Sequence, residues 1–402
     1  MLSSTKALDV AEPDRPFGLV LSGGGARGAF QVGVWEVLRR DAVGLKVDPA
    51  VISGTSAGSI NGSLIAAGFT PEAMMDFWLG LAETPPVTAN EDLFRSLRIQ
   101  LTRLVAREPG RFLRRRTRGA RIMLGLLRHH ALYRPSGWLS LALELLMTAR
   151  YDNLSDVLEG IETSYVFSTG RFRERLVKAF GGEIIRAPKI ALAINTVDVR
   201  TGRVVRFVNR PPGKRAAADD SHYRHHAALT VDMVLASASI PLLFNPVMVD
   251  GLELWDGGLL VNTPLAPAIA LGARRLIPVL VNAGNDASSH KPMHFGTGVE
   301  RLADAFLENA YNTDRKLLLI RNELARVASH IDPGLTHVDL YEPIRPSSSR
   351  TFNAGSYLYF ERDALIKMYE AGRHAARQWL VRGPRLDSTH AGHAGDVPRA
   401  ED

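Results

Sequence analysis

A serine in the centre of a Gly-x-Ser-x-Gly pentapeptide is the residue best suited to nucleophilic chemistry. The pentapeptide Gly54-Thr55-Ser56-Ala57-Gly58 follows an apolar run and opens a stretch of small and apolar residues that ends at Gly68. A sharp turn from strand to helix favours glycine on both sides of its central serine, because larger side chains would collide there. Such a turn exposes the serine hydroxyl at the carboxyl end of a sheet. The alternative is that Thr55 or Ser56 only caps the helix.

A glycine-rich loop could bind negative charge. Gly23-Gly24-Gly25-Ala26-Arg27-Gly28 lies between an apolar run at 17–22 and an amphipathic stretch at 28–40. Glycines there permit positive φ and leave backbone N–H groups uncovered, at a helix N-terminus that favours an anion. The loop could hold a phosphate or the oxyanion of a transition state. Its spacing also fits the dinucleotide fingerprint Gly-x-Gly-x-x-Gly, with Asp48 about twenty residues later. A third interpretation is that the glycines only form a tight turn.

A nucleophilic serine needs a base, and Asp256 is the candidate. The segment Trp255-Asp256-Gly257-Gly258 places a carboxylate beside two glycines. Burial next to Trp255 would raise the pKa of this carboxyl toward the working range. Asp-Gly is also a common turn, so the local sequence leaves both readings open. The histidines at 222, 225 and 226 lie in a polar loop and are expected to be exposed.

The order of these three motifs resembles the patatin-like phospholipase family. Two further segments agree with it, Ala236-Ser237-Ala238-Ser239-Ile240-Pro241 and Val261-Asn262-Thr263-Pro264-Leu265. The resemblance covers roughly 17–282. It implies a three-layer α/β/α fold with a mostly parallel central sheet.

The resemblance also implies an activity. Ser56 and Asp256 would form a dyad that cleaves carboxylic esters of phospholipids or lysophospholipids through an acyl-enzyme. The loop 23–28 would be the oxyanion hole, with Arg27 orienting it or meeting a phosphate. Neither a metal nor another cofactor is implied. Rival readings are an acyltransferase with the same serine, a dinucleotide-binding oxidoreductase, which leaves Ser56 and Asp256 without a role, and a non-catalytic lipid-binding protein.

Alternating apolar runs and amphipathic patterns predict a parallel sheet covered on both faces. Strands are predicted over 17–22, 47–53, 165–169, 189–197, 202–209, 275–282 and 337–342, and helices over 28–40, 56–68, 231–239, 299–328 and 360–381. The predicted domains are a disordered lead-in (1–16), a catalytic domain (17–282), a mostly helical extension packed on it (283–381) and a disordered tail (382–402).

A basic segment interrupts the catalytic domain as a helical insertion at about 94–147. Between residues 95 and 134 arginines alternate with apolar residues and Glu108 is the single acid, whereas the whole chain has a net charge of +7. This pattern is typical of a lid or helix that lies on an anionic membrane surface, and equally of a solvated helical face. Nucleic-acid binding is not expected, because few aromatic residues and no binding motif accompany the arginines.

Composition sets further limits. The absence of cysteine excludes disulfides, a cysteine nucleophile and thiolate metal sites. The first fifteen residues lack the apolar core of a signal peptide, and no apolar stretch is long enough to span a membrane. We therefore expect a cytoplasmic protein, with peripheral membrane contact through the basic segment. The oligomeric state is left open.

Overall fold

The computed structural model describes residues 16–40, 48–83, 86–107, 158–187, 189–214, 222–284, 295–328, 330, 332, 334–347, 354–357 and 360–387. The chain forms two compact units. The first comprises 1–86, 169–241 and 246–402, and the second comprises 87–168 and 242–245.

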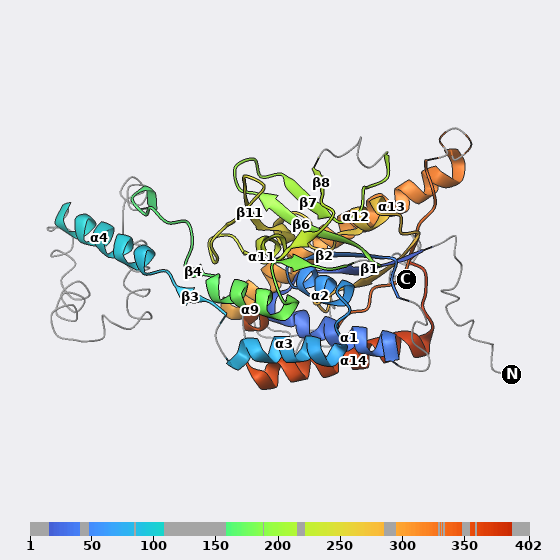
Figure 1. Cartoon of the computed structure of the whole chain (residues 1–402), viewed down its shortest axis with the longest axis horizontal. Coiled ribbons are helices and arrows are strands. Elements are labelled where there is room, and N and C mark those ends of the chain that lie inside the picture. Colours follow the sequence, from blue (N-terminus) through green and yellow to red (C-terminus); the bar gives the residue numbers. More distant parts are fainter. Residues whose placement is uncertain are drawn as a thin grey trace, which may run out of the picture. The chain divides into compact units, whose positions relative to one another are not determined.

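A nine-stranded sheet forms the centre of the first unit (Figure 1). Its strands are β1 (Phe17–Leu21), β2 (Val51–Thr55), β6 (Ala191–Asp198), β7 (Val204–Val208), β8 (Tyr223–His225), β10 (Val247–Val249), β11 (Leu252–Asp256), β12 (Arg275–Val279) and β13 (Asp339–Leu340). The order β10-β11-β6-β2-β1-β12-β13 holds most of them, and β7 pairs with β6 and β8. β6, β2, β1, β12 and β13 are parallel, whereas β11 and β7 run antiparallel to β6.

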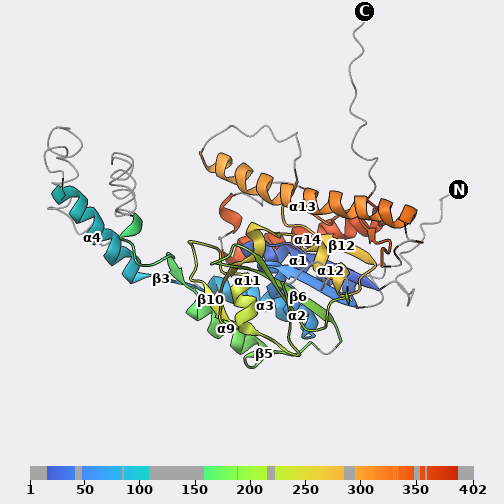
Figure 2. The ribbon, with the colours of Figure 1, turned by 90° about the horizontal axis from the view of Figure 1, so that it is seen from above.

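Helices cover both faces of this sheet (Figures 1 and 2). They are α1 (Gly28–Arg40), α2 (Ala57–Ala66), α3 (Pro71–Glu83), α9 (Gly170–Phe180), α11 (Val231–Ser237), α12 (Leu265–Ala270), α13 (Phe295–Ala328) and α14 (Arg362–Arg382). Successive residues of a strand face opposite sides, so Leu19 and Leu21 join the core under α1, α2 and α14, while Val20 joins the core under α12 and α13. The predicted α/β/α fold with a mostly parallel sheet is confirmed.

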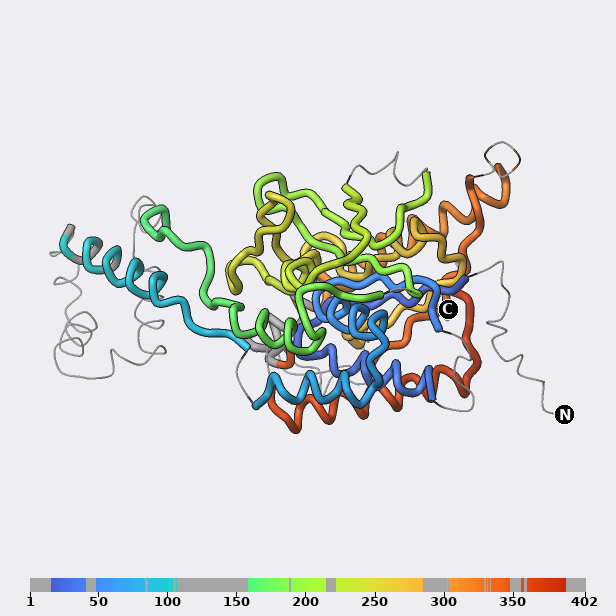
Figure 3. Tube along the Cα trace, viewed as in Figure 1, coloured from blue at the N-terminus to red at the C-terminus, as the bar shows by residue number. Residues whose placement is uncertain are grey.

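The C-terminal part of the chain packs on this core. Helix α14 runs alongside α1 (Figure 3). The tail was predicted to begin at residue 382, but the next residues pair with the strand at the sheet edge: the Asp387 N–H donates to the Leu340 carbonyl at 2.7 Å. The Asp387 carboxylate also binds the Arg315 guanidinium. That part of the tail prediction is wrong, because these contacts hold residues 383–387.

The second unit contains α4 (Glu91–Arg107) and a short antiparallel pair, β3 (Thr88–Ala89) with β4 (Phe167–Ser168). It is wider than the predicted insertion at 94–147. Residues 108–157, which hold most of the basic segment, lie outside the described residues.

Several elements differ from their predictions. The strand predicted at 47–53 is β2 at 51–55, and that at 165–169 shortens to β4. The polar loop expected around the histidines at 222, 225 and 226 contains β8. A further short pair, β5 (Ile184–Ile185) with β9 (Leu229–Thr230), was not predicted. Helices α3 and α9 were missed, although Pro71 occupies the first position of α3, where proline is favoured. No helix within the described ranges is long and apolar enough to cross a bilayer.

Candidate active site

Ser56 occupies a strained turn between β2 and α2. Its φ of 54° and ψ of −123° lie where a residue with a side chain is rarely found, which is typical of functional sites. The Ser56 N–H donates to Ser237 Oγ at 3.0 Å, and Ser237 Oγ donates to the Asn195 carbonyl at 2.6 Å. Both Ser237 and Asn195 are fully buried. The backbone of Ser56 is therefore fixed by α11 and β6 together.

Glycine is required in this turn. A Cβ at Gly54 would lie 2.3 Å from the Gly58 carbonyl oxygen, closer than two such atoms can approach. The turn expected from the pentapeptide thus depends on Gly54 as well as on Ser56.

Gly54→Ala should destabilise the fold by at least about 2 kcal/mol, because the methyl group meets backbone atoms that cannot rotate away. Gly213→Ala is the control, since its nearest atom, the Ala270 carbonyl oxygen, would be 3.6 Å away. Urea unfolding of both variants measures the difference. Equal stability of the two would show that the turn adapts to a side chain.

Asp256 ends β11, and the strand register brings it to Ser56. Within β6, Asn195 is paired with Thr55 of β2, and Thr196 is paired with Asp256 of β11. Ser56 and Asp256 therefore meet across one strand. The Ser56 hydroxyl hydrogen-bonds the carboxylate of Asp256, and the Gly258 N–H donates to Asp256 Oδ1 at 2.7 Å.

Burial dominates the electrostatics of Asp256. The residue is only 5% exposed. Burial raises the pKa of the Asp256 carboxyl to about 7, against the lowering effect of its hydrogen bonds from Ser56 and Gly258. Trp255 was expected to lie against this carboxyl, but the two residues are adjacent in β11, where successive side chains face opposite sides of the sheet.

The glycine loop lies against Ser56. A Cβ at Gly23 would be 3.1 Å from Ser56 Cβ, and one at Gly28 would be 3.1 Å from Ala57 Cβ. The Gly23 N–H already donates to the Asn262 carbonyl at 3.0 Å. Within the described chain, the amides of Gly24 and Gly25 have no acceptor. The Gly23 N–H is therefore already occupied, whereas those of Gly24 and Gly25 remain available to an acceptor.

Three other predicted site residues, Ala26, Gly257 and Gly258, are closely packed. Ala26 is fully buried. A Cβ at Gly257 would meet the Asn195 carbonyl oxygen at 2.5 Å, and one at Gly258 would be 3.1 Å from Asp256 Oδ1. Because Gly257 and Gly258 have no side chains, the chain after Asp256 can lie close to β6 and to the Asp256 carboxylate.

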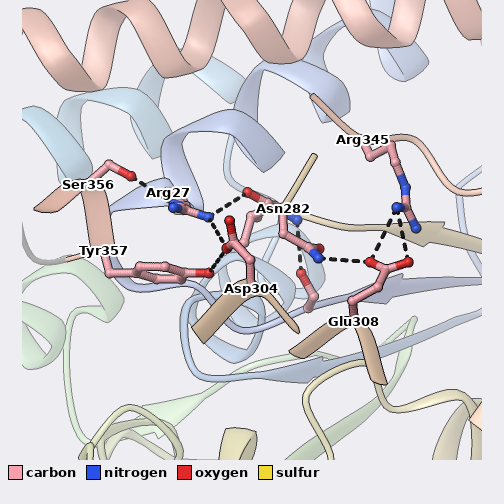
Figure 4. Close-up of polar contacts among 9 residues, drawn as sticks. Arg27, Asn282, Asp304, Glu308, Arg345, Ser356 and Tyr357 are labelled. Atoms are coloured by element: carbon pink, nitrogen blue, oxygen red, sulfur yellow. Dashed lines mark hydrogen bonds and ion pairs between the residues drawn. The ribbon is translucent and has the colours of Figure 1, made fainter. Parts of the chain in front are cut away.

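The Arg27 side chain lies inside the protein. Its side chain is completely buried, and its Nε donates to Ser356 Oγ at 2.8 Å (Figure 4). Its Nη1 lies 3.2 Å from Asp304 Oδ1. The prediction that Arg27 could meet a phosphate is not supported, because solvent cannot reach the guanidinium. A role in orienting the loop fits these contacts.

No histidine approaches the site within the described residues. The Asp256 carboxyl has hydrogen bonds from Ser56 and Gly258 alone there. His226 Nε2 instead lies 2.8 Å from Asp250 Oδ2. The same part of the chain also lacks any group of three or more acidic or histidine residues that could hold a metal ion.

Sequence reasoning missed the residues that hold the turn. Ser237, Ser59 and Asn195 bind one another and the backbone of the pentapeptide, through bonds that include Asn195 Nδ2 to the Gly54 carbonyl at 2.7 Å. The sequence signal that could have identified these residues was the presence of polar residues inside apolar stretches, because buried polar groups normally need hydrogen-bond partners.

Comparison with known proteins gives a family for most of the chain. The family model described as patatin-like phospholipase matches residues 19–269. Among solved structures, the crystal structure of VipD from Legionella pneumophila is similar at 15% sequence identity and a TM-score of 0.36, over 94% of this chain and 68% of that chain. No curated protein matches the chain. The family match contains Ser56 and Asp256, whereas Asp304 and Ser356 lie beyond it.

Proposed function

Because the chain belongs to the patatin-like phospholipase family, a family of lipid acyl hydrolases, we propose that Ser56 and Asp256 form its catalytic dyad. The observation that carries this proposal is the hydrogen bond from a strained serine to a buried carboxyl whose pKa is raised to about 7. Such a carboxyl can both accept and release a proton near neutral pH.

In the first half of the reaction, ionised Asp256 accepts the Ser56 hydroxyl proton as Oγ attacks the carbonyl carbon of an acyl ester. The carbonyl oxygen becomes an oxyanion, which the N–H groups of Gly24 and Gly25 stabilise. The bond between the carbonyl carbon and the leaving oxygen then breaks. That oxygen takes the proton from Asp256 and departs as an alcohol, which leaves an acyl ester on Ser56.

The second half repeats these steps with water. Asp256 accepts a proton from water as the water oxygen attacks the acyl carbon. The bond to Ser56 Oγ breaks, the proton returns to Oγ, and a free fatty acid leaves. Replacement of water by an alcohol gives acyl transfer, so the same residues support both outcomes.

The proposed substrates are phospholipids and lysophospholipids. Incubation of the pure protein with a mixed lipid extract, followed by mass spectrometry, should show free fatty acids increasing as one lipid class decreases. A new acylated alcohol in place of fatty acid would favour transferase activity. An unchanged lipid profile would contradict the proposed function.

We further propose that basic residues 95–134 contact an anionic membrane surface. The part of this segment that is described supports the idea, because Arg95, Arg98 and Arg103 lie exposed on α4 near the exposed Ile99. Each basic residue near such a surface contributes about 1 kcal/mol.

The double variant Arg98→Glu/Arg103→Glu should therefore weaken binding to phosphatidylserine vesicles at least ~30-fold at low salt. Arg200→Glu/Arg203→Glu is the control, since it reverses two exposed arginines in a turn of the other unit. Vesicle co-sedimentation measures both. Equal losses in the two variants would mean that net charge, and not this segment, determines binding.

A further inference from the structure

The glycine loop is held by residues from the far end of the chain. Asp304 belongs to α13, and Ser356 and Tyr357 belong to the short helix η4 (Ala354–Tyr357). All three lie beyond the residues that match the family. They surround the Arg27 side chain on several sides (Figure 4).

The contacts neutralise a buried charge. Arg27 Nη1 lies 3.2 Å from Asp304 Oδ1 and also donates to the Val281 carbonyl at 3.3 Å. The Tyr357 hydroxyl donates to the same Asp304 oxygen at 2.7 Å, and Arg27 Cζ lies over the Tyr357 ring, 3.6 Å from the ring centre. A buried guanidinium is stable only with such partners, so loss of the Asp304 charge weakens one of the interactions that hold it in place.

The backbone transmits this restraint to the loop. The Arg27 N–H donates to the Gly24 carbonyl at 3.1 Å. That carbonyl and the Gly25 N–H belong to one planar peptide group, so fixing one fixes the direction of the other. Gly25 has a φ of 54°, and a Cβ there would lie 2.1 Å from the Tyr357 carbonyl oxygen. Residue 357 therefore covers the loop directly and also acts through Arg27.

We propose that Asp304, Ser356 and Tyr357 are positioning residues, which act through Arg27 to aim the Gly24 and Gly25 amides at the oxyanion. This inference rests on the proposed function, because it assigns the loop its place in ester hydrolysis. It adds a dependence of the active site on a segment outside the family domain.

Helix α13 supplies a matched control. Glu308 lies one turn after Asp304 and is also a carboxylate bound by an arginine, since Arg345 Nη1 lies 3.2 Å from Glu308 Oε1. Glu308 also accepts from Asn282 Nδ2 at 2.8 Å (Figure 4). Among the described residues its polar contacts are with Asn282 and Arg345, so Glu308→Gln disturbs the same helix without touching Arg27.

Asp304→Asn should lower kcat on a soluble short-chain ester by about 10- to 100-fold, as expected when a catalytic group is slightly misplaced. KM should change little, because the loop acts on the transition state. Affinity for a trifluoromethyl ketone, which forms an oxyanion on the serine, should fall by a similar factor. Tyr357→Phe and Ser356→Ala should give smaller losses in the same direction.

Glu308→Gln should keep the wild-type kcat. The inference is wrong if Glu308→Gln and Asp304→Asn lower kcat equally, or if all three positioning variants keep the wild-type rate. If Asp304→Asn does not fold, Tyr357→Phe and Ser356→Ala decide the question, because each removes only one oxygen atom.

Hydrogen exchange separates this inference from the proposed function. Peptides that cover residues 22–31 should exchange faster in Asp304→Asn than in wild type or Glu308→Gln. If the wild-type protein hydrolyses no ester, the proposed function is wrong. The positioning contacts are then tested by the hydrogen-exchange rates alone. Unchanged exchange in that case would overturn them.

Discussion

Ser56→Ala is expected to abolish ester hydrolysis, with kcat lowered by at least ~10⁴-fold. The substitution removes the oxygen that forms the acyl bond and leaves the backbone contact to Ser237 intact. Ser63→Ala is the control, because Ser63 lies on α2, the helix that follows Ser56, and its Oγ has no partner within the described residues. Initial rates on a chromogenic short-chain ester measure both variants.

A second serine variant separates chemistry from folding. Ser56→Gly should be equally inactive but more stable than Ser56→Ala by about 1 kcal/mol, since glycine adopts a positive φ without strain. Thermal unfolding compares the two. Activity near the wild-type level in both variants would contradict the proposal that Ser56 is the nucleophile.

Asp256→Asn is expected to lower kcat by at least ~10³-fold, because the amide cannot accept the serine proton. In the wild type, kcat/KM should rise with pH and level off above about 7, since only ionised Asp256 acts as a base and burial raises its pKa to about 7. Asp250→Asn, in the turn before β11, should keep the wild-type profile because its side chain is 41% exposed and its carboxylate faces His226. A histidine variant that loses activity while Asp256→Asn keeps it would overturn the dyad.

The same pKa predicts how stability depends on pH. The folded protein keeps the Asp256 proton up to a pH of about 7, whereas the unfolded chain releases it near the ordinary value of 3.8. The stability from this group is therefore full below pH 3.8 and is lost as pH rises to about 7. The loss is roughly 4 kcal/mol at most. Asp256→Asn lacks this loss, so its stability relative to wild type should increase between pH 5 and pH 8 in urea unfolding.

Local sequence was sufficient to predict the turn at Ser56 and insufficient to predict which residues lie around it. The Ser56 turn is encoded within five residues, because its glycines and its flanking strand and helix are contiguous. For Asp256 the local sequence left a base and a simple turn both open, since its approach to Ser56 depends on how β11 and β2 pair with β6. No local pattern encodes that register.

Long-range partners were beyond prediction. Arg27 and Ser356 are separated by 329 positions, and nothing near either residue indicates the other. Ser237 and Asn195 stood in segments recognised as a family block and a strand, but their hydrogen bonds arise from packing. The alternation of strands and helices did predict the α/β/α layers. Apolar strands indicate a sheet buried on both faces, and amphipathic helices indicate the elements that cover it.

The pairing of β11 with β6 makes the site sensitive to slippage. Asp256 reaches Ser56 from its place opposite Thr196, and in a pleated strand a shift by a single position turns each side chain to the other face. If one residue were inserted between β10 and β11 and this pairing shifted by one position, the Asp256 side chain would face the opposite side of the sheet. The protein would then retain every chemical group of the proposed site and still have no carboxyl beside Ser56.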